Sequence, residues 1–279
     1  MTIWFSTNIP EMRAISVFNR ASNDIAEIQQ RIGTGQRILS GRDDPGGLVV
    51  REGLRADIKG IHGLQLQMNQ AEILTNIAST GMMDLLGMLV GEDMRNPSEA
   101  SLIGVLNNLG DDFDAINDVA KAFIGMYDAA VARVRYGGDN LLSGFTRDFR
   151  LGGADNNLTI TIGNLADGGA AAALKTALRV TIQNAGHVDD VVAAVDDLQD
   201  VITKELGKLG GSQGIVAMNQ RLLDSQLTSL VAAEGRISNA DLAVESSRLA
   251  RAELLAQNAM QSILYNRSFA AFSVRSLFG

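Results

Sequence analysis

The sequence predicts a mostly α-helical protein: long antiparallel helices in a coiled-coil-like bundle, with a small central β-hairpin region. Apolar residues recur every three or four positions over long stretches in both halves of the chain, which is the helical period. Prolines number 3 among 279 residues, so few positions interrupt a helix. Only residues 149–164 change to a period of two, where a turn-rich stretch leads into Leu158, Ile160 and Ile162.

An apolar stripe marks the first helix. Its members lie three or four residues apart, at Ile15, Phe18, Ser22, Ile25, Ile28 and Ile32. The segment 33–35, Gly-Thr-Gly, ends the pattern. Residues 40–47, "SGRDDPGG", then separate this helix from the next.

This segment also carries the signals that restart a helix. Asp43 or Asp44 can cap the helix by accepting hydrogen bonds from its first N–H groups, which contributes about 1 kcal/mol. Pro45 suits the first helical position, where its missing N–H has no cost. The spacing predicts that the renewed helix continues to about Met94.

A second restart is predicted at Asn96 and Pro97. The stripe that follows, from Ile103 to Tyr127, predicts one further helix that ends near residues 136–144. Residues 165–187 fit either a short helix or a loop. Helix is expected again from Val188.

The C-terminal half contains a strict heptad series: Leu209, Val216, Leu223, Leu230 and Ile237. The complementary heptad positions are mostly polar, which favours one helix of an antiparallel bundle over a two-stranded coiled coil. A last amphipathic helix follows, and the members of its stripe are Leu242, Glu245, Leu249, Ala252, Ala256, Ala259 and Ile263. Phe269 and Phe272 lie close to the end of the chain.

Both ends of the chain are therefore amphipathic, and neither helix can bury its stripe alone. Burying five or six of these side chains would stabilise by roughly 8–15 kcal/mol before entropy is subtracted. The expected self-assembly core is Ile15, Phe18, Ile25, Ile28, Ile32, Leu242, Leu249, Ala256, Ile263, Phe269 and Phe272. The pattern alone fits an ordinary monomeric bundle as well as helices that become ordered on self-association.

Composition excludes several classes of partner. The formal net charge of −8 argues against nucleic acid, and the absence of cysteine rules out disulfides. No run of about 18 apolar residues predicts membrane insertion. The first 20 residues carry Glu11, Arg13 and Arg20 and lack a continuous apolar run, so export without a cleavable signal peptide is expected.

No residue set predicts catalysis, a metal site or a cofactor. His62 and His187 are the only histidines, and no His-Glu-x-x-His pattern occurs. The carboxylate clusters at residues 111–114 and 189–190 lack the spacing of a calcium loop and fit solvated helix starts. We therefore expect a structural protein and no enzyme.

Several stretches resemble the signatures of bacterial flagellins. They are "IQQRIGTGQRILSGRDDPGGLVVREGLRADIKGI" (28–61), "YGGDNLLSG" (136–144), "LGGSQGIVAMNQRL" (209–222) and "EGRISNADLAVESSRLARAELLAQNA" (234–259). Each match is weak alone, but all occur in the family's order. In the family, N- and C-terminal helices pair into an inner core, a helical rod encloses that core, and the chains stack into the helical filament that propels the cell.

The resemblance implies the domain organisation. Residues 1–40 with 241–279 would form the inner core helices, and residues 41–144 with 188–240 the helical rod domain. Residues 145–187 would be a small β or irregular insert of the rod. Asp43, Asp44 and Pro45 would form the spoke that joins core to rod.

The resemblance also implies partners and a location. The main partner would be the chain itself, as a helical homopolymer in an extracellular flagellar filament. A flagellar export chaperone, hook-associated proteins and cap proteins would be further partners. Two alternatives stay open: the hook–filament junction protein of the same architecture, and a secreted helical adhesin that does not polymerise.

One departure from the family pattern concerns an innate immune receptor. A flagellin-sensing Toll-like receptor reads a basic residue in an Arg-Glu-Leu-Ala-Val-like stretch of the family. An ungapped count from the Asp43–Asp44 pair places Glu92 at that position. The sequence therefore predicts that this chain evades the receptor.

Overall fold

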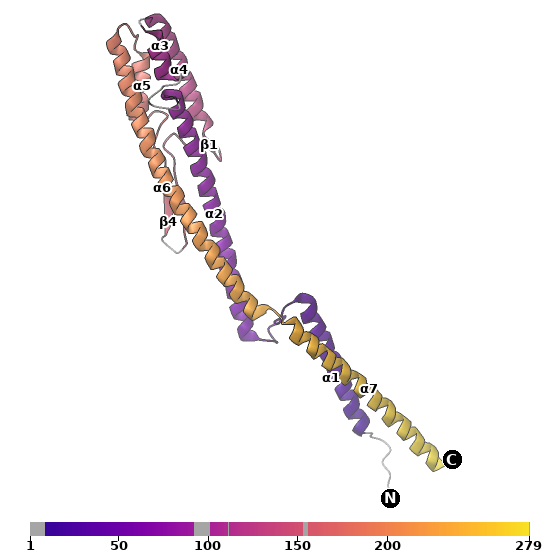
Figure 1. The fold of residues 1–279 in the computed structure, drawn as a ribbon. Coiled ribbons are helices and arrows are strands. Elements are labelled where there is room, and N and C mark those ends of the chain that lie inside the picture. Colours follow the sequence, from indigo (N-terminus) through magenta and orange to yellow (C-terminus); the bar gives the residue numbers. More distant parts are fainter. Residues whose placement is uncertain (1–8, 92–100, 111, 153–155, 279) are drawn as a thin grey trace. The chain divides into compact units, whose positions relative to one another are not determined.

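The computed structural model describes residues 9–91, 101–110, 112–152 and 156–278, although the side chains of 269–271 and 273–278 are not described. In these residues four helices come first, two small antiparallel sheets follow, and three further helices complete the chain (Figure 1). The predicted fold class is confirmed. The chain divides into two compact units, residues 1–59 with 227–279 and residues 60–226.

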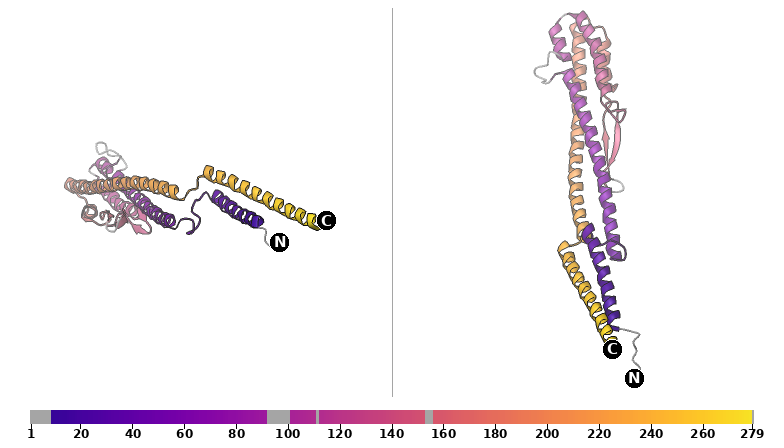
Figure 2. Two further views of the ribbon diagram at one scale, coloured as in Figure 1. Left: turned by 90° about the horizontal axis from the view of Figure 1, so that it is seen from below. Right: turned by 90° about the vertical axis from the view of Figure 1, so that its right-hand side faces the viewer.

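The first unit is built on helices α1 (Ile9–Thr34) and α7 (Leu242–Phe278). They pack side by side in opposite directions, as both views in Figure 2 show. The unit also contains the beginning of α2 (Pro45–Leu89) and the end of α6 (Ala185–Ser238). The predicted end of α1 at residues 33–35 is confirmed.

The second unit contains the rest of α2 and α6, which run antiparallel. Hydrogen bonds between their polar side chains show this direction, because residue numbers rise along α6 as they fall along α2. Gln213 Nε2 donates to Asn76 Oδ1 (3.0 Å), and Gln220 Nε2 donates to Asn69 Oδ1 (3.1 Å). The apolar heptad residues Leu209, Val216 and Leu223 are buried beside these pairs. The contact therefore has an apolar side and a hydrogen-bonded side, as the polar complementary heptad positions indicated.

The predicted single helix between Ile103 and Tyr127 is wrong. The structure has two helices, α3 (Leu102–Leu109) and α4 (Phe113–Arg133). Gly110 interrupts them with a φ of 57°, a conformation that glycine adopts at little cost. Asp112 then caps α4 by accepting a hydrogen bond from the Ala115 N–H (3.1 Å).

Other boundaries also differ from expectation. Helix α2 ends at Leu89; Met94, its predicted end, and the predicted cap at Asn96 and Pro97 lie outside the described residues. Of the two alternatives for residues 165–187, a short helix or a loop, the structure has the helix, α5 (Gly169–Arg179).

Two hairpins follow α4. Strands β1 (Arg135–Tyr136) and β2 (Asp139–Asn140) flank Gly137 and Gly138, which both have positive φ (62° and 101°), as a tight hairpin turn requires. Strands β3 (Thr146–Arg150) and β4 (Asn157–Thr161) form the predicted central hairpin. Its apolar face, with Phe149, Leu158 and Ile160, is buried.

The central hairpin is fastened to both long helices. The Arg150 N–H donates to Gln67 Oε1 of α2 (3.0 Å), and Asn219 Nδ2 of α6 donates to the Leu151 carbonyl (3.4 Å). Beyond it, α4 and α5 contribute further core side chains, among them the buried Ile116, Phe123 and Leu174. Within the second unit, the central hairpin, α4 and α5 thus cover part of the surface of α2 and α6.

Candidate functional site

The contact between α1 and α7 is a heptad seam of small and aliphatic side chains. On α1 the buried residues are Ala14, Ala21 and Ile28, seven residues apart. Phe18, Ile25 and Ile32 alternate with them and are half-buried. On α7 the buried positions Glu245, Ala252 and Ala259 have the same spacing. A seam rich in alanine allows two helix backbones to approach closely.

The predicted self-assembly residues occupy different environments. Ile28 and Ile263 are buried in the seam, and Phe18, Ile25, Ile32, Leu249 and Ala256 are half-buried. Ile15, Leu242 and Phe272 are exposed, Phe272 at 70%. The side chain of Phe269 is not described. The structure therefore brings seven of these eleven residues together between α1 and α7.

The sequence identified Ala252 and Ala259 on the α7 stripe, but the buried alanines of α1 were missed. Ala14 and Ala21 were not recognised because alanine is a weak indicator of burial next to isoleucine and phenylalanine. Their seven-residue spacing was the available signal, since it is the period at which two long helices meet.

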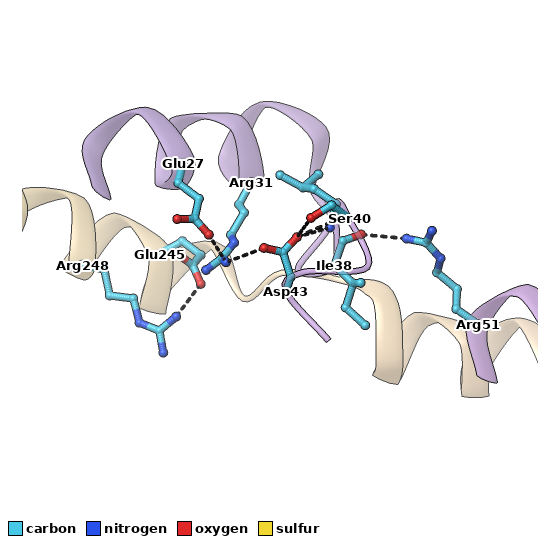
Figure 3. Close-up of polar contacts among 9 residues, drawn as sticks. Glu27, Arg31, Ile38, Ser40, Asp43, Arg51, Glu245 and Arg248 are labelled. Atoms are coloured by element: carbon cyan, nitrogen blue, oxygen red, sulfur yellow. Dashed lines mark hydrogen bonds and ion pairs between the residues drawn. The ribbon is translucent and has the colours of Figure 1, made fainter. Parts of the chain in front are cut away.

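The loop between α1 and α2 assigns different roles to its two aspartates. Asp44 is the cap: its Oδ1 accepts from the Gly47 N–H (2.8 Å), and Pro45 begins α2. Asp43 closes the loop, because its Oδ2 accepts from the N–H groups of Ser40 (2.8 Å) and Leu39 (3.0 Å) (Figure 3).

These bonds change the acidity of Asp43. The hydrogen bond from the Ser40 N–H is the largest influence and holds the pKa of the Asp43 carboxyl below its usual value. Arg31 adds a weaker attraction, with its Nη2 3.7 Å from Asp43 Oδ1. The carboxylate form therefore stabilises the loop.

Two arginines hydrogen-bond the loop between α1 and α2 to neighbouring segments of the first unit. Arg51 is buried and its Nη1 donates to the carbonyl of the fully buried Ile38 (2.7 Å). The Arg37 N–H donates to the Ser238 carbonyl (2.7 Å), and the Arg37 side chain donates to the Ile237 carbonyl. The loop after α1 is thus fastened to the start of α2 and to the end of α6.

The start of α7 is capped as well. Asp241 Oδ1 accepts from the N–H groups of Ala243 (2.9 Å) and Val244 (3.2 Å). The sequence reasoning did not identify this cap, although an aspartate directly before an apolar stripe is a helix-start signal.

Large apolar side chains remain exposed on α1 and α7. They are Ile9, Met12, Ile15, Val17, Leu242, Val244, Leu254, Leu255, Met260, Leu264, Tyr265 and Phe272. The longer helices α2 and α6 also expose apolar side chains, among them Leu66, Met83 and Met218, but less densely along their length. A dense group of exposed apolar side chains is typical of an interaction surface.

The described residues contain no cluster of three or more acidic or histidine side chains that could hold a metal ion. None of the helices in the described residues is long and apolar enough to span a bilayer. His62 lies at the surface, with its Nδ1 3.1 Å from Gln65 Oε1. Glu92, the predicted departure at the receptor motif, lies outside the described residues.

Comparison with known proteins connects this architecture to a family. Residues 5–146 match the family model of the bacterial flagellin N-terminal helical region, and residues 192–264 match that of the bacterial flagellin C-terminal helical region. The first match alone spans more than half of the chain.

Full-length relatives agree with these matches. Flagellin FljO of Caulobacter vibrioides is 26% identical over 279 residues, covering 98% of this chain and 97% of the relative. The flagellin of Bacillus subtilis is 25% identical, covering 90% and 92% of the two chains. Polar flagellin C of Vibrio parahaemolyticus is 26% identical over 144 residues, which is 52% of this chain and 36% of the relative.

The family is one of structural proteins that assemble into the extracellular filament of the flagellum. The chain belongs to the bacterial flagellin family and is a structural subunit of the flagellar filament.

Proposed function

We propose that the two ends of the chain, residues 1–40 with 241–279, form the inner core of the filament. Residues 41–144 with 188–240 form the rod domain around this core, and residues 145–187 are its insert. The observation that carries the proposal is the contrast in burial. On α1 and α7 only the side chains of the common seam are buried, whereas α2 and α6 carry a continuous series of fully buried side chains such as Leu74, Met82 and Leu198.

The self-assembly residues follow from this assignment. Ile28 and Ile263 hold α1 against α7, while Ile15, Leu242 and Phe272 remain exposed for contact with neighbouring copies. Asp43, Asp44 and Pro45 act as the spoke between core and rod. Asp44 with Pro45 restarts the helix, and Asp43 fixes the loop that precedes it.

The chain contains no cysteine, so a single introduced cysteine reports its own environment. We compare Leu264→Cys on α7 with Thr159→Cys on β4, since both side chains are exposed in the single chain. Seeded filaments of each variant are treated with a maleimide reagent. The thiol at position 159 is expected to react in filaments, whereas the thiol at position 264 is expected to react only in the unassembled chain.

Equal labelling of both variants in assembled filaments would contradict the inner location of α7. Labelling of unassembled chains is the control, because both thiols should then react at similar rates. Electron microscopy of the same samples shows whether filaments have formed.

We also propose that the chain leaves the cell by the flagellar export route with the help of an export chaperone. Contacts with hook-associated proteins at the base of the filament and cap proteins at its tip are proposed on the basis of the family. Pull-down of the full chain with each candidate protein tests these contacts. Absence of binding by freshly purified monomer would contradict them.

We propose that Glu92 prevents recognition of this chain by a flagellin-sensing Toll-like receptor. A basic residue at this position is part of the receptor-binding motif that the resemblance implies, so a carboxylate there should prevent recognition. Purified monomer is expected to give no response in reporter cells that express the flagellin-sensing Toll-like receptor. A strong response would overturn the proposal.

A further inference from the structure

The α1–α7 pair has a groove along one flank. One part is an apolar hollow of about 450 Å³, lined among others by Ala14 and Val17 of α1 and Ala259 of α7. Next to it is a charged hollow of about 270 Å³, lined among others by Arg31 and Arg251. Leu255 lines both hollows, so they form one groove with an apolar end and a charged end.

One arginine of the charged hollow is available to a carboxylate from another molecule. Arg31, Arg248 and Arg251 line the hollow together with Asp24 and Glu27. Arg31 already pairs with Glu27 and with Asp43, and Arg248 pairs with Glu245. In the described part of the chain Arg251 forms no ion pair. Arg31 Nε is a buried donor without a hydrogen-bond acceptor.

The opposite flank of α7 carries a matching row of side chains. Glu253, Met260 and Leu264 are separated by seven and four residues, which places them on one stripe of the helix at about 100° per residue. All three are exposed, and Glu253 forms no ion pair among the described residues. Arg251 is two residues from Glu253 and therefore about 200° away around the helix. We call this stripe the α7 ridge.

The order of chemistry along the ridge equals that along the groove. From Arg251 in the charged hollow, seven residues lead to Asn258 and eleven to Ser262, which both line the apolar hollow. From Glu253 on the ridge, the same seven and eleven residues lead to Met260 and Leu264. With Glu253 at Arg251, Met260 reaches the level of Asn258 and Leu264 that of Ser262, which line the apolar hollow together with Ala14 and Val17.

We propose that the α7 ridge of one copy docks, in parallel orientation, into the α1–α7 groove of a second copy, with Glu253 paired to Arg251. This inference rests on the self-assembly of the chain and specifies the two surfaces that meet. Groove and ridge lie on opposite flanks of the same helix pair, so each docked copy still presents both surfaces to further copies. Such a heterologous contact does not close and produces an open helical polymer.

A charge-exchange experiment tests the pairing. In Arg251→Glu both surfaces carry acidic groups, and in Glu253→Arg both carry basic groups, so each variant repels its own copies. Each is expected to elongate wild-type seeds at least tenfold more slowly than wild type. A one-to-one mixture of the two variants restores opposite charges at every contact and should recover elongation, as should the double variant R251E/E253R.

Arg221→Glu on α6 is the control for the charge change itself, since Arg221 is exposed and belongs to the other compact unit of the chain. It should elongate like wild type. Single variants that elongate normally would overturn the inference, and so would a mixture and a double variant that both fail while their helical circular dichroism is intact. Failure of the wild-type chain to elongate would contradict filament formation itself, which separates the two failures.

Cross-linking gives an independent readout. Val17→Cys places a thiol in the groove and Met260→Cys places one on the ridge, in a chain without other cysteines. A short bis-maleimide should join the two variants when they are co-polymerised, and should join neither variant to itself. Absence of the mixed dimer in assembled filaments would overturn the proposed contact.

Discussion

The helix pairs α1–α7 and α2–α6 both run antiparallel and both meet along heptad-spaced side chains, but their surroundings differ. Along α2–α6, the fully buried Leu74, Met82 and Leu198 lie beneath other segments, and amide side chains bond along the polar side. Along α1–α7, burial is confined to the seam, and Leu254, Leu264 and Tyr265 are each about 60–70% exposed. The same helical period thus produces a continuous buried core in one pair, although Leu66 and Met218 are exposed on its outer face, and only a narrow buried seam in the other.

The largest effect is expected from shortening α7, because its pair with α1 is incompletely buried in the single chain. Deletion of residues 264–279 removes the end of α7 and the exposed Leu264, Tyr265 and Phe272. We expect seeded polymerisation to be abolished, because too little apolar surface remains for neighbouring copies. Light scattering and electron microscopy measure the loss. The thermal transition of residues 60–226 should be unchanged, and normal filaments from this variant would contradict the comparison.

A matched pair of substitutions compares the two regions directly. Leu198→Ala removes a fully buried side chain of α6, which should lower the free energy of unfolding by about 2–5 kcal/mol. Leu254→Ala removes a side chain that is 59% exposed on α7, so its effect on the monomer should be below about 0.5 kcal/mol. Urea unfolding of the monomer measures both. Similar losses from the two variants would show that α7 is already packed in the single chain.

The second unit also has a buried cation. Lys175 Nζ contacts Asp128 Oδ1 (2.6 Å) and Asp167 Oδ1 (3.0 Å) and lies above the ring of Tyr127. Lys175→Met should destabilise this unit by about 1.5–3 kcal/mol, the usual contribution of hydrogen bonds to charged groups. Lys175→Arg, which keeps the charge, is the control. A melting temperature unchanged in Lys175→Met would contradict the assigned role.

The same cluster predicts a response to alkali. Burial lowers the pKa of Lys175, but its hydrogen bonds to Asp128 and Asp167 outweigh this, so the pKa is raised above its ordinary value of 10.5. Burial also raises the pKa of Tyr127. Stability from both groups is fully present below their unfolded pKa values and is lost as pH rises through the folded values. Melting should therefore be constant from pH 7 to about 9 and should fall above pH 10, less steeply in Lys175→Met.

A smaller effect is expected at the helix restart. Asp44→Ala removes the cap of α2 and should cost about 1 kcal/mol. Asp44→Asn keeps an accepting oxygen and serves as the control. Hydrogen exchange of the Gly47 amide measures the effect, and unchanged protection in Asp44→Ala would show that the cap is dispensable.

The smallest effect is expected from acidification, which protonates Asp43 and weakens the loop between α1 and α2. The pKa of Asp43 is lowered in the fold, so its stabilisation is present above the ordinary value of 3.8 and is lost as pH falls through the folded pKa. The Leu39 and Ser40 amides should lose protection below that pH, and Asp43→Asn should remove this dependence. Protection that is independent of pH in the wild-type chain would contradict the bonds to Asp43.

Much of this fold could be predicted because helix period, hairpin alternation and capping signals are local. Leu158 and Ile160 identified the central hairpin, and Pro45 identified the start of α2. The break at Gly110 was missed in the apolar spacing, which continues across it. The signal that could have revealed it is the carboxylate cluster at residues 111–114, which fits a helix start and contains Asp112, the cap of α4.

The candidate site was less predictable. The sequence identified the apolar members of the α1 and α7 stripes. The spacing alone does not indicate which side of each helix packs against the partner helix and which side remains exposed. Ile15 and Ile28 look equivalent in the sequence, yet Ile28 is 8% exposed and Ile15 is 38% exposed. The groove depends on packing between distant segments. Asp43 and Asp44 divide their roles through bonds to residues three or four positions away, and the sequence does not indicate which of two adjacent aspartates caps the helix.

The central claim is that α1 and α7 are fully covered only among other copies of the chain. Hydrogen exchange of the full-length protein, in dilute solution and in seeded filaments, tests it most directly. We expect amides of α1 and α7 to exchange much faster in the dilute monomer than those of α6 near Leu198, and to become protected in the filament. Equal protection of α7 and α6 in the dilute monomer would contradict the account.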